Sequence, residues 1–178
     1  NKETAQAIIA SCRDVPRFKI FTTGEPFHYG DVLIHPFSVQ HDAMDPVAFT
    51  FEFEGMKVGL CADLGFVSSL VTHHLQGCEY LYLEANHQPS MVYASPRPVV
   101  YKQRVLSRQG HLSNEEAGHL LASIHHDKLK HVYLAHLSSE CNSPELALKI
   151  IGDLLQASNK PLSLSIAHQD EVSLLTRF

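Results

Sequence analysis

Two short apolar runs on either side of a helix signal constrain the fold of this chain more than any other feature of its sequence. Residues 79–84 (EYLYLE) and 130–135 (KHVYLA) have the length and composition of buried strands. Between them, Ser113 and Glu116 stand at the spacing of a capping box, which predicts a helix that ends near residue 126. Strands that alternate with helices in this way indicate an α/β fold.

The chain before residue 63 has a different pattern, in which a short helix at residues 2–11 is followed by β-like runs and turns. The runs cover residues 18–21, 32–40, 47–52 and 56–62. After residue 63 the other expected elements are helices at 64–75 and 143–157 and strands at 162–167 and 172–176. Antiparallel-looking strands followed by alternating strands and helices predict one half of a mixed α/β sandwich.

Length, charge and cysteine content limit the class of protein. A chain of 178 residues is expected to form one domain, residues 1–178, since domains average about 150 residues. The net charge of −5 gives no overall basic field that would recruit nucleic acid or an anionic membrane, and no apolar run approaches the ~20 residues that span a bilayer. Four cysteines without a C-x-x-C spacing indicate free thiols in a reducing cytoplasm.

The thirteen histidines almost equal the fourteen lysines and arginines together, and their positions relative to strand ends separate them. His41, Asp63 and His136 each follow an apolar run directly, where loops leave a rigid sheet and sites are built. Imidazoles and a carboxylate that converge from distant positions are what a divalent metal site requires. Each of the three alone is more simply a loop residue or a helix cap, but the three together favour a metal site.

Two further histidines occupy comparable positions. His87 comes just after the run 79–84, and His111 comes just before the capping box. At a helix N-terminus the dipole lowers the pKa of an imidazole and favours an anionic phosphate. Most of the remaining histidines are expected on helices or at their ends, on the solvated surface.

Residues 97–108 carry a local excess of positive charge. Arg97, Lys102, Arg104 and Arg108 occur there without an acidic residue, in a chain that is acidic as a whole. Such a cluster beside a metal site could hold a phosphate backbone. A solvated helix face explains the same pattern equally well.

At these residues the chain resembles the metallo-β-lactamase fold hydrolases, in particular their WalJ/YycJ-type branch, which is related to tRNase Z and to the β-CASP nucleases. The matching phrases are PFSVQHDAMDP (36–46), CADLG (61–65), LEANH (83–87), KQR (102–104), GHLSN (110–114) and AHLS (135–138). The resemblance runs in order from about residue 20 to residue 170. It implies the αββα sandwich of that fold.

The resemblance also implies two divalent metal ions, with zinc favoured and manganese or iron as alternatives. His41 looks like the later ligand of the first metal, Asp63 like the bridging carboxylate and His136 like the last ligand of the second metal. His111 matches the histidine of the GHSS segment of tRNase Z-like enzymes, which protonates or orients the leaving oxygen.

Four other residues complete the expected site. His87 lies in the loop that tRNase Z-like enzymes carry beside the active site, and we take it as a second catalytic candidate. Lys102, Arg104 and Asn114 are expected to contact the substrate.

The family holds its metals with an upstream H-x-H-x-D-H motif as well, and no such motif occurs in these 178 residues. Together with a first residue that is Asn rather than Met, this predicts a C-terminal portion of the sandwich that lacks the first strands. Such a chain should bind metal weakly. It should be active only if an N-terminal portion, or another copy of the chain, supplies the other ligands.

Three functions are therefore open. The favoured one is a metal-dependent phosphodiesterase, a nuclease that acts on DNA or RNA through a water activated by two metals. The second is another hydrolase of the same fold, which cleaves a thioester, a lactone or a β-lactam. The third is a catalytically incompetent fragment that only binds a partner. The basic segment 97–108 and the cytoplasmic signals favour the nuclease.

Overall fold

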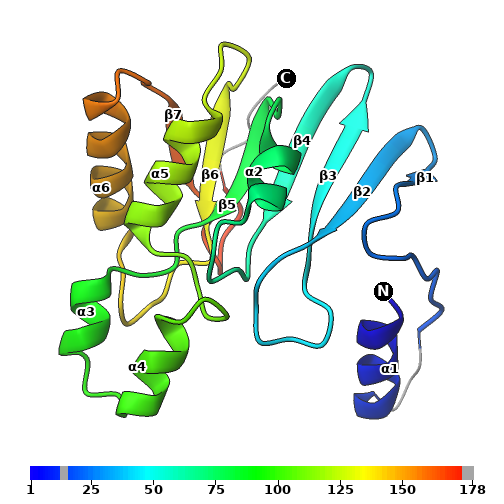
Figure 1. The fold of residues 1–178 in the computed structure, drawn as a ribbon, viewed down its shortest axis with the longest axis horizontal. Helices are drawn as coiled ribbons and strands as arrows, with labels where there is room; N and C mark the ends of the chain where they lie inside the picture. The colour runs from blue at the N-terminus through cyan, green and yellow to red at the C-terminus, as the bar shows by residue number, and fades with distance from the viewer. Residues whose placement is uncertain (13–15, 174–178) are drawn as a thin grey trace.

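The computed structural model describes residues 1–12 and 16–173, and its centre is one seven-stranded sheet whose strands lie in chain order (Figure 1). The strands are β1 (Phe27–Tyr29), β2 (Val32–Ser38), β3 (Val47–Phe53), β4 (Met56–Cys61), β5 (Tyr80–Glu84), β6 (His131–Ala135) and β7 (Ser163–Ile166). Neighbours from β1 to β4 pair antiparallel, and neighbours from β4 to β7 pair parallel. The α/β class and the change of pattern after β4 are as the sequence predicts.

Parallel neighbours need crossover connections, and helices supply them. The helices are α1 (Lys2–Ser11), α2 (Ser69–Leu75), α3 (Pro89–Ala94), α4 (Val99–Val105), α5 (Asn114–Ile124) and α6 (Pro144–Ala157). At the start of α5 the Ser113 hydroxyl accepts from the Glu116 amide, and the Glu116 carboxylate accepts in return from the Ser113 amide. This confirms the predicted capping box.

The helices α2, α5 and α6 lie on the same side of the sheet, and the core is between them and the strands (Figure 1). Side chains alternate along a strand, so Leu81 and Leu83 of β5 and Val132 and Leu134 of β6 all face the helices. They pack there with Leu121 and other helix residues in one buried cluster.

The opposite face of the sheet carries apolar side chains that stay partly exposed. Leu60 is 39% exposed and Tyr82 is 37% exposed, and both alternate with buried residues of the helix-covered face. Phe53 is exposed to a similar degree. An apolar face of this kind fits the side on which the second sheet of an αββα sandwich would pack.

The strand predicted at residues 18–21 is wrong, because these residues are irregular and the first strand is β1. Phe21 stacks on Phe27 at 5.5 Å between ring centroids and meets Phe49 edge-on at 5.7 Å. Its apolar side chain is therefore partly buried by packing on the sheet, without strand pairing.

Other elements also differ from expectation. The helix predicted from residue 64 begins at Ser69, because the Ser68 hydroxyl accepts from the Val71 amide and caps it there. The short helices α3 and α4 were not predicted as separate elements. Of the strand predicted at 172–176, residues 172–173 are irregular, and the rest lie outside the described residues. Within the described part of the chain, no helix is both long and apolar enough to cross a membrane.

Candidate metal centre

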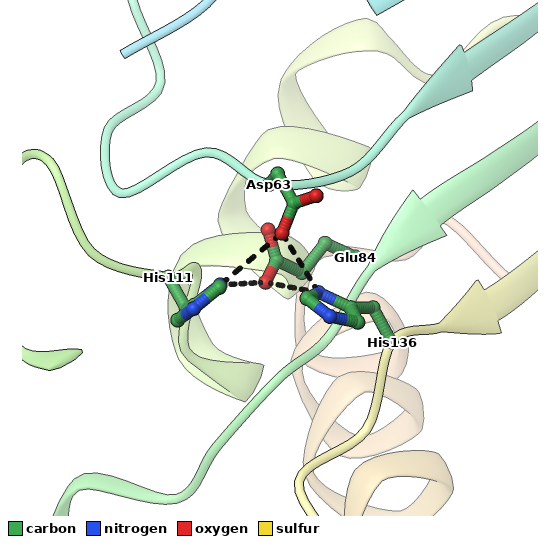
Figure 2. Close-up of side chains that lie close together, drawn as sticks. All are labelled: Asp63, Glu84, His111 and His136. Carbon is green, nitrogen blue, oxygen red and sulfur yellow. Dashed lines mark hydrogen bonds and ion pairs between the residues drawn. The ribbon is translucent and has the colours of Figure 1, made fainter. Parts of the chain in front are cut away.

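Four side chains with metal-binding atoms meet at one edge of the sheet (Figure 2). Asp63, Glu84 and His136 stand at the carboxyl ends of β4, β5 and β6, and His111 lies just before α5. Each residue offers one ligand atom, and these atoms all lie within 4.8 Å of one another. The carboxyl ends of neighbouring parallel strands share one edge, so residues distant in sequence come together there.

The three residues singled out as metal ligands lie close together in the structure. Asp63 Oδ1 is 3.3 Å from His136 Nδ1 and 3.8 Å from His41 Nε2. The His41 ring is also close to the His111 ring, with centroids 5.0 Å apart. One carboxylate thus lies within 4 Å of imidazoles from two distant segments of the chain.

Asp63 and His136 both have left-handed backbone conformations, with φ of 58° and 54°. A residue with a Cβ adopts this conformation at a cost of about 1–2 kcal/mol, and such strain collects at functional sites. In both cases the turn follows a parallel strand directly. It directs the side chain into the cluster instead of continuing the strand.

Glu84 is fully buried and joins three parts of the site. Its Oε1 accepts from His111 Nδ1 at 2.7 Å and from His136 Nδ1 at 3.1 Å, and its Oε2 accepts from the Leu64 amide at 2.8 Å. The sequence marks Glu84 only as the polar end of an apolar run. Its two imidazole partners come from distant segments that sequence reasoning could not pair with it.

The charge of Glu84 is stabilised by these contacts. Burial by itself would raise the pKa of Glu84, but the hydrogen bonds from His111, His136 and the Leu64 amide together lower it. The bond to Glu84 in turn raises the pKa of His136. Because each Nδ1–H is directed at the carboxylate, Nε2 is the nitrogen of each ring that remains to bind a metal or a substrate.

Two glycines allow the loops of the site to approach one another. His41 Nδ1 donates to the Gly110 carbonyl at 2.9 Å, and its Nε2 lies 3.3 Å from Asp42 Oδ1 and 3.8 Å from Asp63 Oδ1. A Cβ on Gly65 would lie 2.5 Å from the Gly110 nitrogen, and a Cβ on Gly110 would lie 2.2 Å from the Arg104 carbonyl. No other residue fits at these positions without moving the loops.

His87 and Asn114 lie outside this cluster. The His87 side chain is 2% exposed, its burial lowers its pKa, and its Nδ1 has no hydrogen-bond partner among the described residues. Asn114 is fully buried and pairs with Asn142, each side-chain amide donating to the other's oxygen at 3.0 Å. Both side chains are thus buried, whereas a part-exposed position was expected for residues that meet a substrate.

The cations of the basic segment have partners within the chain. Arg104 is paired with Asp42, Arg97 with Glu140, and Lys102 Nζ donates to a backbone carbonyl at 2.6 Å. In the structure, these cations are therefore engaged within the chain instead of being fully solvated or unpaired and available to a phosphate. Arg104 nevertheless lines a cavity of about 250 Å³ with Tyr101, His111 and His136, whereas Lys102 does not.

The donor set fits divalent metal ions of the kind expected. The Asp63 side chain is half-exposed, and the His41 and His136 imidazoles beside it offer nitrogen ligands. Zinc takes such nitrogen and carboxylate ligands at about 2.0–2.2 Å. Both oxygens of buried Glu84 already accept hydrogen bonds, so Glu84 suits a residue that orients the imidazoles and does not itself bind the metal.

Comparison with known proteins gives relatives in sequence and in fold. No protein-family model matches the chain. It is 35% identical over 137 residues to the exodeoxyribonuclease YycJ of Bacillus anthracis, which covers 77% of this chain and 52% of the relative. The chain thus spans about half the length of the curated relatives it matches.

Two solved structures have a similar fold at low sequence identity. The metallo-β-lactamase fold protein YhfI of Bacillus subtilis has a TM-score of 0.67 and 16% identity, over 94% of this chain and 58% of YhfI. The Zn²⁺-bound PqqB of Methylobacterium extorquens has a TM-score of 0.60 and 16% identity, over 91% of this chain and 59% of PqqB. The sheet and these likenesses define the chain as a metallo-β-lactamase fold protein. In sequence, the chain is similar to exodeoxyribonucleases named YycJ and WalJ, as its motifs predict.

Proposed function

We propose that this chain supplies part of the two-metal centre of a hydrolase that cleaves phosphodiester bonds in DNA or RNA. The observation that carries the proposal is the convergence of His41, Asp63 and His136, with buried Glu84 hydrogen-bonded to His136. The exodeoxyribonuclease activity in the name of the YycJ relative supports the choice of nucleic acid. Residues 1–178 would form one metallo-β-lactamase-like domain.

In this proposal His41 would hold the first metal and His136 the second, and the Asp63 carboxylate would be shared between them. Half-exposed Asp63 suits a bridging role, since its carboxylate lies between the two imidazoles. When bound, the two ions would provide a hydroxide near neutral pH and offset the charge that develops on the phosphate. We favour zinc on the nitrogen and carboxylate donors, and manganese or iron accept the same ligands.

His111 acts as the proton donor rather than as a ligand. Its Nδ1–H is bonded to the buried Glu84 carboxylate, which orients the ring and leaves Nε2 to serve the departing oxygen. General-acid catalysis of this kind contributes about 10²–10⁴-fold in rate. Arg104, which lines the adjoining cavity, would contact the phosphate once a substrate competes with Asp42 for its guanidinium.

The site needs ligands that these 178 residues do not contain, since they carry no H-x-H-x-D-H motif. We propose that an N-terminal portion with that motif supplies them and packs on the apolar face that includes Leu60 and Tyr82. A second copy of this chain would repeat the same ligands and lack the same motif. The four cysteines are all free thiols, which supports the cytoplasm as the compartment.

The test is a nuclease assay with end-labelled single- and double-stranded DNA and with Zn²⁺ or Mn²⁺. The chain is assayed alone and mixed with the part of the Bacillus anthracis relative that lies outside the matched region. We expect metal-dependent release of nucleotides from the mixture, lost with EDTA and with Asp63→Asn but not with Asp153→Asn, because Asp153 lies on the exposed face of α6.

Two outcomes would contradict the proposal. Cleavage of a thioester, a lactone or a β-lactam without cleavage of DNA or RNA would favour the second class of hydrolase. A mixture that binds metal but cleaves none of these substrates would favour a non-catalytic binding role.

A further inference from the structure

A buried amide network lies behind the candidate metal centre and joins the loops that carry it. Its members are Asn86 after β5, Asn114 at the start of α5 and Asn142 just before α6. All three side chains are less than one-tenth exposed. Buried amides of this kind persist only when their donors and acceptors are satisfied.

Asn142 is the most connected member. Its Nδ2 donates to the carbonyls of Ala85 and Asn86, at 2.8 and 3.1 Å, and to Asn114 Oδ1 at 3.0 Å. Its Oδ1 accepts from Asn114 Nδ2 and from the Ser143 amide, both at 3.0 Å. One side chain therefore ties the end of β5 to the starts of α5 and α6.

The segments that Asn142 joins lie next to the metal-binding side chains. Glu84 directly precedes Ala85, and His111 lies three residues before Asn114. Asn86 Nδ2 donates at 2.7 Å to the carbonyl of His136, the residue in the left-handed conformation, and the Asn86 carbonyl accepts from the Ser138 amide at 2.8 Å. A shift of any of these loops would separate the two imidazoles from their shared carboxylate.

We propose that Asn142 is a positioning residue of the metal centre: through Ala85, Asn86 and Asn114 it sets the spacing at which Glu84, His111 and His136 meet. The predicted effect on metal affinity rests on the proposed function. The predicted effect on the geometry of the metal-free site does not, and it can be tested separately. Asn142 itself is not a member of the cluster of metal-binding side chains.

The first test follows the imidazole Nδ1–H protons of His111 and His136 by NMR in the metal-free chain. A proton held on a buried carboxylate is protected from exchange and resonates far downfield. We expect these resonances in the wild type and their loss in Asn142→Ala and in Asn142→Leu, because leucine keeps the volume but offers no amide.

The second test is Co²⁺ and Zn²⁺ affinity, measured by competition with a chromophoric chelator, together with the visible spectrum of the Co²⁺ form. Removing an outer partner of a metal site typically weakens binding 10–100-fold, so we expect a loss of about 10-fold or more and an altered Co²⁺ spectrum. Asn114→Ala should give a similar loss, and the double variant should lose little more than either, since the two amides act as a pair.

Ile151→Val, a core change on α6 away from the network, is the control for general loss of stability. It should leave both the resonances and the Co²⁺ spectrum unchanged. The proposal is overturned if Asn142→Leu keeps the downfield protons, or if Ile151→Val removes them to the same degree. If the wild-type chain shows the protons but binds no metal even with the N-terminal portion added, the proposed function fails while the positioning role stands.

Discussion

The substitution Glu84→Ala tests whether the buried carboxylate stabilises the loops of the site and, through them, the fold. The substitution removes the acceptor of the His111 and His136 Nδ1–H groups and of the Leu64 amide. A buried donor left without a partner costs about 1–3 kcal/mol. His136 is 44% exposed at its side chain and regains water, so the cost falls mainly on His111 and Leu64.

The expected loss in the free energy of unfolding is therefore about 3–5 kcal/mol, which is also the usual cost of breaking a buried ion pair from one side. With a urea dependence of about 2 kcal/mol per molar, the unfolding midpoint should fall by roughly 2 M. The assay is urea unfolding of the metal-free chain, followed by far-ultraviolet circular dichroism in the presence of EDTA.

Glu79→Ala is the matched control, because Glu79 stands just before the same strand and its partner is the exposed ammonium of Lys130, at 2.8 Å. Surface ion pairs contribute little, so its midpoint should stay near that of the wild type. If Glu84→Ala unfolds at the same urea concentration as Glu79→Ala, Glu84 does not hold the loops and the reasoning is refuted.

Three further predictions concern the site and the thiols. In an assembled active enzyme, His111→Ala should keep its metal and lose about 10²-fold or more in kcat, whereas His136→Ala should lose metal; equal metal loss in both would make His111 a ligand. Gly110→Ala should weaken metal binding and lower the melting temperature, because its Cβ would meet the Arg104 carbonyl at 2.2 Å; an unchanged melting temperature would contradict this. Iodoacetamide at pH 8 should modify exposed Cys12 quickly and Cys61 only after unfolding, because burial raises the pKa of the Cys61 thiol; mass spectrometry of the labelled peptides decides.

Local signals in the sequence predicted the elements that local interactions determine. The capping box at Ser113 and Glu116 is made within four residues, so its spacing alone located the start of α5. The convergence of His41, Asp63 and His136 was also predictable, because each follows an apolar run and strand ends share an edge.

Features that depend on distant partners were not predictable in this way. The buried role of Asn114 depends on Asn142, and the role of Glu84 depends on two imidazoles from other segments. Phe21 lies in a strand-like run but packs on Phe27 and Phe49 instead of pairing. In each case the sequence carries the residue type, and only the fold brings its partner within reach.

Anomalous diffraction from crystals of the chain soaked in zinc would test the central claim most directly. We predict an anomalous peak at the edge of the sheet, about 2.0–2.2 Å from a carboxylate oxygen of Asp63 and from an imidazole Nε2 of His41 or His136. Glu84 should remain bonded to the Nδ1 atoms of His111 and His136. Zinc bound through Glu84 itself, or zinc bound elsewhere with none at Asp63, would contradict the account.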